Sequence, residues 1–379
     1  MAHDLPSLIR LRHWLHAHPE LSRQEGATAR HLRGFLQDSA PPDRIVPLHG
    51  AGFAAVYDGR AAGPTVLLRC ELDALPIHET NADLAYRSIV DGVGHKCGHD
   101  GHMAILAGVA QELAARPLAG RVVLLFQPDE ETGTGARDSL AHPNFAQLAP
   151  DYAFALHNLP GYPAGEVVCR AGTFASEVLY AAVRFTGKEA HSAQPETGAS
   201  PAFAAAELTL ATRTIQAAHD RPEAYALAVP VFARMGVAAS GISPAEGEVH
   251  VTLRAPESAT VDQMWQALTD TARALAQRDG LDVAFEVREH FPATQNAERA
   301  VAMIARAADQ AGLTYRTIDH PFRWGEDFGA LIRDTPGAMF GLGAGQGRPD
   351  LHHADYDFPD AILPQGIAMF MALIDAALS

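Results

Sequence analysis

The first part of the chain alternates between the hydrophobic pattern of helices and that of buried strands. Residues 8–16 and 27–36 repeat apolar side chains at the helical period, which predicts two amphipathic helices. A third helix is predicted at residues 103–115. Short apolar runs predict buried strands at residues 65–69, 121–126 and 151–156. Strands that alternate with helices indicate an α/β fold with a mostly parallel sheet covered on both faces.

The pattern changes near residue 176. The predicted order becomes strand, helix, strand, strand, helix, strand, which is the split βαβ arrangement of a ferredoxin-like module. These elements are expected at residues 177–187, 200–218, 225–235, 247–254, 260–278 and 281–288. Helix and strand patterns like those of the first part resume from residue 298. We therefore predict one α/β domain made of residues 1–176 and 290–379, with a small α+β domain inserted at residues 177–289.

Length, composition and charge narrow the classes of protein. With 379 residues, two domains are the default, and 47% hydrophobic with 20% charged residues is typical of a folded globular chain. The formal net charge of −16 argues against a nucleic-acid or anionic-membrane partner. No apolar stretch of about 18 residues or more predicts a membrane span. The sequence has only three cysteines and no signal-peptide pattern, so we expect a cytoplasmic protein.

Polar side chains follow three of the predicted strands directly. Cys70-Glu71-Leu72-Asp73 comes after the first, Gln127-Pro128-Asp129-Glu130-Glu131 after the second, and His157-Asn158 after the third. Open α/β sheets bind ligands beyond the carboxyl ends of their strands. A single acidic residue in such a place is usually a turn or cap residue. Three polar strand ends together predict one crevice that carries chemistry.

The segment His95-Lys96-Cys97-Gly98-His99-Asp100-Gly101-His102 is the densest cluster of reactive side chains in the chain. Thiolate, imidazole and carboxylate together are the ligands of a borderline-soft divalent metal such as zinc. Cys97 and His99 are two residues apart, so in an extended loop both can face one metal. A helix is expected to begin just after them, and its N-terminal amides favour a thiolate. The alternative is an inert buried cysteine beside a helix cap.

Two pairs of adjacent polar residues could complete such a metal site. The side chains of Glu130 and Glu131 would point opposite ways on extended backbone. One carboxylate could then bind a metal while the other accepts a proton from water, as metal-assisted hydrolysis requires. The alternative for this pair is a solvated acidic turn. His352-His353 lies in a predicted loop and could close the site, although such a pair is more often exposed to solvent.

Ordered motifs along nearly the whole chain resemble the M20 metallopeptidase family. The likeness is to its amidohydrolase branch, which contains hippurate hydrolases, N-acyl amino acid amidohydrolases and auxin-conjugate hydrolases. The matching segments are Leu15-His16-Ala17-His18-Pro19-Glu20-Leu21, Glu71-Leu72-Asp73-Ala74-Leu75-Pro76, Cys97-Gly98-His99-Asp100-Gly101-His102, Gln127-Pro128-Asp129-Glu130-Glu131, His157-Asn158, Gly187-Lys188-Glu189-Ala190-His191, Gly325-Glu326-Asp327-Phe328 and Leu351-His352-His353.

The resemblance implies a catalytic domain with two divalent metal ions, which could be zinc, manganese, cobalt or nickel. The positions that match the family's metal ligands are Cys97, His99, Glu131, His157 and His352. Glu130 matches the general base, and Asp73 matches a carboxylate that orients a ligand. The inserted domain is then a lid and dimerisation domain. From it, His191 would stabilise the oxyanion, often across a dimer interface, and Arg254 would hold a substrate carboxylate.

Several positions depart from the pattern of the branch. The family usually has Asn-Val-Ile-Pro where this chain reads Ser240-Gly241-Ile242-Ser243-Pro244. The asparagine that helps to bind the substrate carboxylate in relatives is therefore missing, and glycine stands at position 241. Glu71 replaces the usual aspartate and keeps its charge, while Cys70 and Lys96 stand where alanine is usual.

We therefore expect a metal-dependent hydrolase that cleaves the amide bond of an N-acyl amino acid or a similar small conjugate. Water that bridges the two ions would lose its proton to Glu130 and attack the carbonyl carbon. The resemblance also implies a homodimer through the inserted domain. One alternative is a dipeptidase or aminopeptidase of the same family. An alternative of another class is a relative that binds a metal or metabolite without catalysis.

Overall fold

The chain divides into two compact units, which are described separately. The structure is a computed structural model, and it describes residues 3–115 and 119–378. The larger unit consists of residues 1–174, 294–321 and 327–379. The inserted unit consists of residues 175–293, together with the short segment 322–326.

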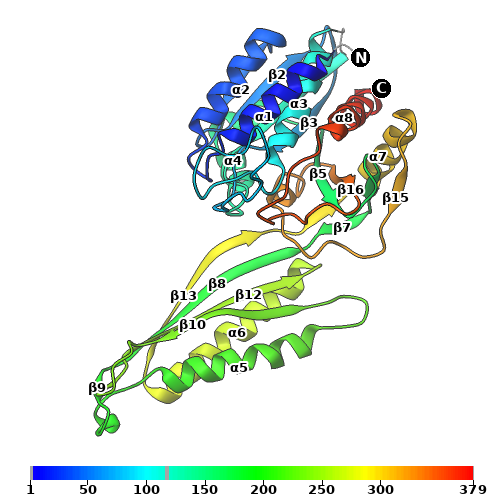
Figure 1. Ribbon diagram of the computed structural model, residues 1–379. Coiled ribbons are helices and arrows are strands. Elements are labelled where there is room, and N and C mark those ends of the chain that lie inside the picture. The colour runs from blue at the N-terminus through cyan, green and yellow to red at the C-terminus, as the bar shows by residue number, and fades with distance from the viewer. Residues whose placement is uncertain (1–2, 116–118, 379) are drawn as a thin grey trace. The chain divides into compact units, whose positions relative to one another are not determined.

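The larger unit is built on an eight-stranded sheet that is parallel at its centre (Figure 1). Its strands, in spatial order, are β1 (Arg44–Pro47), β2 (Phe53–Asp58), β4 (Ala119–Gln127), β3 (Ala61–Glu71), β5 (Tyr152–Pro160), β16 (Gly337–Gly345), β6 (Val167–Cys169) and β15 (Tyr315–Thr317). Neighbouring strands run parallel from β4 through β3 and β5 to β16. The predicted α/β class is confirmed, and the three predicted strands with polar ends are adjacent and parallel.

Helices bury the sheet of the larger unit against a continuous core. The helices are α1 (Leu5–Ala17), α2 (Gly26–Ser39), α3 (His99–Ala114), α4 (Gly135–Ala141), α7 (Glu298–Gln310) and α8 (Leu363–Leu378). A separate two-stranded sheet joins β7 (Gly172–Ala175) and β14 (Thr294–Asn296). Consecutive residues of the central strands, such as Leu67 and Leu68, are both fully buried. This burial on both faces explains why these strands read as short apolar runs rather than as alternating patterns.

The C-terminal helix is apolar enough to need an explanation. Residues 360–378 reach a mean hydropathy of 1.8, so length and composition alone would allow this segment to cross a membrane. However, Leu363, Ile367, Phe370 and Ile374 are buried in the core of the larger unit. We interpret α8 as a core helix of the larger unit.

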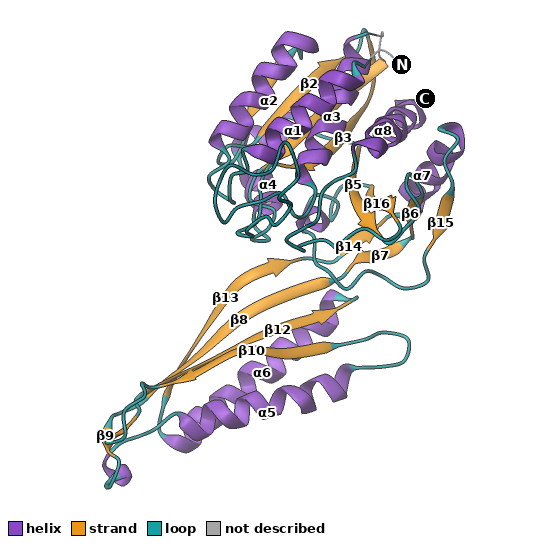
Figure 2. Cartoon of the chain, viewed as in Figure 1, coloured by secondary structure: helices purple, strands orange, loops and turns teal. Residues whose placement is uncertain are grey.

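The inserted unit has the ferredoxin-like arrangement expected from the sequence (Figure 2). Its antiparallel sheet has the order β10 (Leu227–Met235), β12 (Glu246–Ala255), β8 (Glu177–Thr186) and β13 (Asp282–Phe291). Two helices, α5 (Ala202–His219) and α6 (Ser258–Asp279), share one core with this sheet. Each helix has buried apolar side chains at helical spacing, among them Leu208 in α5 and Met264 in α6. Two very short strands, β9 (Ala190–His191) and β11 (Ile242–Ser243), pair outside the main sheet.

Candidate metal centre

Cys97 and His99 lie close together because of a tight turn rather than an extended loop. Gly98 between them has a φ of +92°, and a Cβ atom there would lie 2.6 Å from the side-chain oxygen of Asn158. Helix α3 begins at His99 itself, so the expectation that the helix starts after this residue is wrong. The turn places both residues in one group with His157, which lies within strand β5 and not after it. The Cys97 Sγ atom is 3.4 Å from His157 Nε2.

The two adjacent glutamates point toward the same imidazole. We expected Glu130 and Glu131 to diverge on extended backbone, but they lie in a turn between Asp129, with a φ of +60°, and Gly133, with a φ of +71°. His99 Nε2 is 4.0 Å from Glu130 Oε2 and 3.9 Å from Glu131 Oε1. The expectation of opposite directions is therefore wrong. Both carboxylates are available to one centre.

His352 approaches the same place from the loop between β16 and α8. Its Nε2 atom is 4.0 Å from Glu131 Oε1. It forms a group with Cys97 and Glu131 in which the candidate ligand atoms all lie within 4.8 Å of one another. The candidate ligand atoms of Cys97, His99 and His157 also lie within 4.8 Å of one another. All five residues that match the family's ligand positions are thus brought into two groups that share Cys97.

Asp73 contacts both the turn that carries Glu131 and the first residue of helix α3, His99. Its Oδ2 atom accepts hydrogen bonds from the Ser22 hydroxyl, at 2.7 Å, and from the backbone N–H of Glu131, at 2.9 Å. The backbone carbonyl of Asp73 is 2.9 Å from His99 Nδ1. Because a carbonyl can only accept, Nδ1 of His99 carries the proton and Nε2 is left as the basic atom. Ser22 could not be predicted from the sequence, since a single serine has no pattern to recognise.

The donor set fits a divalent metal. His99 Nε2 and Asp73 Oδ1 are buried and have no hydrogen-bond partner in the described part of the chain. Burial lowers the pKa of His157 to about 3, so its imidazole is neutral, as a metal ligand requires. Burial also raises the pKa of the Cys97 thiol well above its usual range. Binding of a metal to this thiol would therefore release a proton.

His102 and Asp100, also in the 95–102 segment, make hydrogen bonds next to the candidate ligands. His102 Nδ1 is 2.7 Å from Glu71 Oε2, and its Nε2 is 2.5 Å from the side-chain oxygen of Asn158. Asp100 accepts a hydrogen bond of 3.0 Å from Arg12 Nε on helix α1. Of this dense cluster, Cys97 and His99 are thus candidate ligands, while His102 contacts strands β3 and β5 and Asp100 contacts helix α1.

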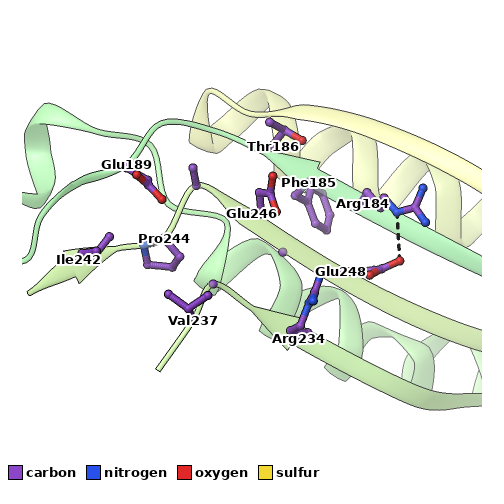
Figure 3. Close-up of a pocket in the computed structure, with 13 residues that line it drawn as sticks. Arg184, Phe185, Thr186, Glu189, Arg234, Val237, Ile242, Pro244, Glu246 and Glu248 are labelled. Carbon is purple, nitrogen blue, oxygen red and sulfur yellow. Dashed lines mark hydrogen bonds and ion pairs between the residues drawn. The ribbon is translucent and has the colours of Figure 1, made fainter. Parts of the chain in front are cut away.

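In the inserted unit, the two substrate-related features of the sequence lie side by side. Ile242 pairs with His191, and the Ser192 N–H donates to the Gly241 carbonyl at 3.0 Å. The altered segment 240–244 is therefore a neighbour of His191. This segment also borders an open pocket of about 320 Å³, in which the guanidinium of Arg184 is already bound to Glu248 at 3.0 Å (Figure 3).

Arg254 lies at the opposite end of the inserted sheet from His191. Strand β12 begins at Glu246, opposite Thr186 and close to the β9–β11 pair, and Arg254 is eight residues further along. Eight strand residues span about 26 Å. The half-buried Arg254 donates to the carbonyl of Arg323 at 3.0 Å. His191 and Arg254 of one chain are thus much further apart than the length of a small substrate.

Comparison with known proteins gives one consistent result. Residues 67–376 match the model of peptidase family M20/M25/M40. Two curated relatives are an N-acetyl-L-cysteine deacetylase of Bacillus subtilis, 31% identical over 94% of this chain and 84% of the relative, and an N-acetyldiaminopimelate deacetylase of Lacticaseibacillus casei, 28% identical over 97% of both. A solved structure, the YXEP protein of Bacillus subtilis, is described as a dinuclear metal binding peptidase from the M20 family. It is 27% identical, with a TM-score of 0.82, over 99% of this chain and 98% of that one.

These matches confirm the resemblance inferred from the motifs. The family model covers most of the chain, and the relatives extend over nearly its full length. The chain therefore belongs to peptidase family M20/M25/M40, as a metal-dependent hydrolase of its amidohydrolase branch.

Proposed function

We propose that this chain removes the acyl group from an N-acyl amino acid by hydrolysing the amide bond. The observation that carries the proposal is the convergence of Cys97, His99, Glu131, His157 and His352 into two overlapping groups, with the carboxylate of Glu130 beside them. The names of the curated relatives agree with this substrate class, because they describe deacetylases of N-acetylated amino acids.

The five ligand residues would hold two divalent metal ions. The mixture of thiolate, imidazole and carboxylate suits zinc, and manganese, cobalt or nickel could bind the same set. When bound, such ions polarise a carbonyl group and lower the pKa of a water molecule. Asp73 would keep His99 in the correct tautomer and orientation for this role, through the hydrogen bond from Nδ1 to its own carbonyl.

The residues of the chain itself account for the movement of protons. Glu130 is almost completely buried, and its carboxylate lies 4.0 Å from His99 at the edge of the ligand groups. There it would take a proton from the attacking water and deliver it to the leaving nitrogen. His191 is exposed, and its Nδ1 accepts the N–H of Ala193 at 3.0 Å. Its Nε2 therefore carries the proton and can donate it in a hydrogen bond to the developing oxyanion.

We further propose that the active form is a homodimer with composite sites. An N-acyl amino acid spans much less than the separation of about 26 Å along strand β12 between Arg254 and the end of the sheet near His191. One substrate can meet both side chains only if they come from two chains. Arg254 would hold the substrate carboxylate with its guanidinium fork, while His191 of the second chain reaches the carbonyl oxygen.

An apolar edge of the inserted unit offers the surface for this dimer. Strand β10 lies at the edge of the inserted sheet, and helix α5, which precedes it in the sequence, packs against it. Large apolar side chains on these two elements are exposed, namely Phe203 (74%), Leu210 (59%), Val231 (53%), Met235 (45%), Phe232 (44%) and Val229 (43%). A groove of about 440 Å³ runs between the two elements. An unpaired apolar edge of this kind is an aggregation risk unless a second chain covers it.

Charged substitutions on this edge should produce monomers. We expect the Leu210→Glu/Val231→Glu variant to elute and scatter light as a monomer, because burying two carboxylates from each chain at the interface would cost more than the apolar contact contributes. Its kcat/KM should fall at least about 100-fold, as removal of an oxyanion donor predicts. The matched control is Val287→Glu on the opposite edge strand β13, where the side chain is also exposed (47%). A dimeric and active edge variant would contradict the proposed interface.

A substrate panel with metal removal tests the proposed reaction. N-acetylated amino acids, including N-acetylcysteine and N-acetyldiaminopimelate, are compared with unblocked dipeptides, and the released amine is measured. We expect hydrolysis of the N-acetyl compounds, loss of activity with a chelator, and recovery with zinc, manganese, cobalt or nickel. Preference for dipeptides would favour the dipeptidase alternative. Uptake of metal without hydrolysis of any compound would favour a non-catalytic relative.

A further inference from the structure

Lys96 is a buried cation between two segments that carry candidate metal ligands. Its side chain is fully buried, next to Cys97 in sequence. Its Nζ atom donates to the backbone carbonyl of Tyr356 at 2.8 Å, and its own carbonyl accepts the N–H of His352, also at 2.8 Å. One residue thus holds the 351–357 loop at two points, on His352 itself and four residues beyond it.

The conformation of His352 shows why this loop must be held. The backbone of His352 has a φ of +65°, which residues other than glycine seldom adopt. Its side chain is 51% exposed. Such a conformation persists only where the surrounding structure imposes it. The loop has further anchors, since Thr80 donates to the Ala354 carbonyl at 3.1 Å and Tyr86 donates to Asp357 at 2.9 Å. Lys96 supplies two hydrogen bonds that connect it to the segment carrying Cys97.

The charge of Lys96 is balanced by a carboxylate from another part of the chain. Nζ is 2.6 Å from Glu79 Oε1, and Glu79 also accepts the N–H of Ser88 at 2.6 Å and lies 3.0 Å from His16 Nε2. Burial acts to raise the pKa of Glu79, but the hydrogen bonds from His16 and Lys96 outweigh it and lower this pKa to about 2. Glu79 is therefore ionised, and its contacts with His16 of helix α1 and with Ser88 fix the position in which it meets Lys96.

We infer that Lys96 is a positioning residue, which sets His352 against Cys97 and Glu131 through the Tyr356 carbonyl and so determines the affinity of the metal site to which His352 contributes. The inference rests on the proposed function for the identity of the ligands. It concerns a lysine that the proposed reaction does not use directly.

A Co²⁺ titration tests the inference without using activity. The full-length protein is first freed of bound metal with a chelator and is then titrated with Co²⁺. Wild-type protein should take up two equivalents of Co²⁺, measured by calorimetry and by the sulfur-to-cobalt absorption of Cys97. Lys96→Met should bind the first equivalent with unchanged affinity and the second about 10–100-fold more weakly, the range typical of residues that orient a metal ligand. The Ile304→Ala variant in the core of α7 is the control, with a lower Tm but two unchanged affinities.

A double variant separates positioning from charge balance. In Lys96→Met/Glu79→Gln no unpaired carboxylate remains, so stability should return toward that of the wild type. If Lys96 positions His352, the second equivalent still binds weakly, because the donor to Tyr356 is still missing. Recovery of both affinities in the double variant would overturn the inference, and so would two normal affinities in Lys96→Met. Wild-type protein that binds fewer than two equivalents would overturn the proposed function, and this inference with it.

Discussion

Replacing Glu130 with glutamine should lower kcat about 10²–10⁴-fold while the protein still binds its full complement of metal. The substitution keeps the size and polarity of the side chain and removes the atom that accepts a proton. Glu130 lies 4.0 Å from His99 and forms a candidate group with His99 and Glu131, but it does not match a ligand position of the family, and the five residues that do are unchanged in this variant. Single-turnover kinetics combined with metal analysis of the purified protein would measure both effects.

Glu131→Gln is the matched control for this prediction. The two residues are adjacent in one turn and at similar distances from His99, 4.0 and 3.9 Å. Glu131 also belongs to the group with Cys97 and His352, so its variant should lose affinity for metal and recover activity in part at high metal concentration. If Glu130→Gln lost metal, or retained near-normal turnover with metal bound, Glu130 would not be the general base.

Both folds could be predicted because burial leaves clear patterns in the sequence. The strands at 65–69, 121–126 and 151–156 are apolar on consecutive residues, since both faces of the sheet are covered. Strands β1 and β2 at the antiparallel edge, and β16 in the middle, gave no prediction. β16 reads Gly337-Ala-Met-Phe-Gly-Leu-Gly-Ala-Gly345, and its many glycines hide the strand pattern.

The geometry of the candidate site was harder to predict than its composition. The motifs indicated which residues gather, but the directions of Glu130 and Glu131 depend on a backbone turn with positive φ at Asp129, and the preference of aspartate for this conformation is too weak to predict the turn. Contacts between distant segments were also invisible. Lys96 and Glu79 form a pair only because the chain between them folds back, and the sequence offered nothing to connect them.

Mixing two inactive variants should restore activity if the sites are composite. His191→Ala and Arg254→Ala, each expressed alone, should lose at least about 100-fold in kcat/KM, because one lacks the oxyanion donor and the other lacks the carboxylate fork. Co-expression with two different affinity tags yields mixed dimers. Each mixed dimer has one site with a normal His191 from one chain and a normal Arg254 from the other. Its activity should be about half that of the wild type, as two-fold symmetry requires.

The reverse pairing decides between composite sites and sites within one chain. A mixed dimer of wild-type chain with a His191→Ala/Arg254→Ala chain contains no site in which both residues are normal, if the two come from different chains. It should therefore be nearly inactive, although half of its chains are wild type. If both residues served the site from the same chain, this dimer would retain about half the activity and the first mixture would have none. The separation along β12 within one chain argues for the first outcome, because no small substrate spans it.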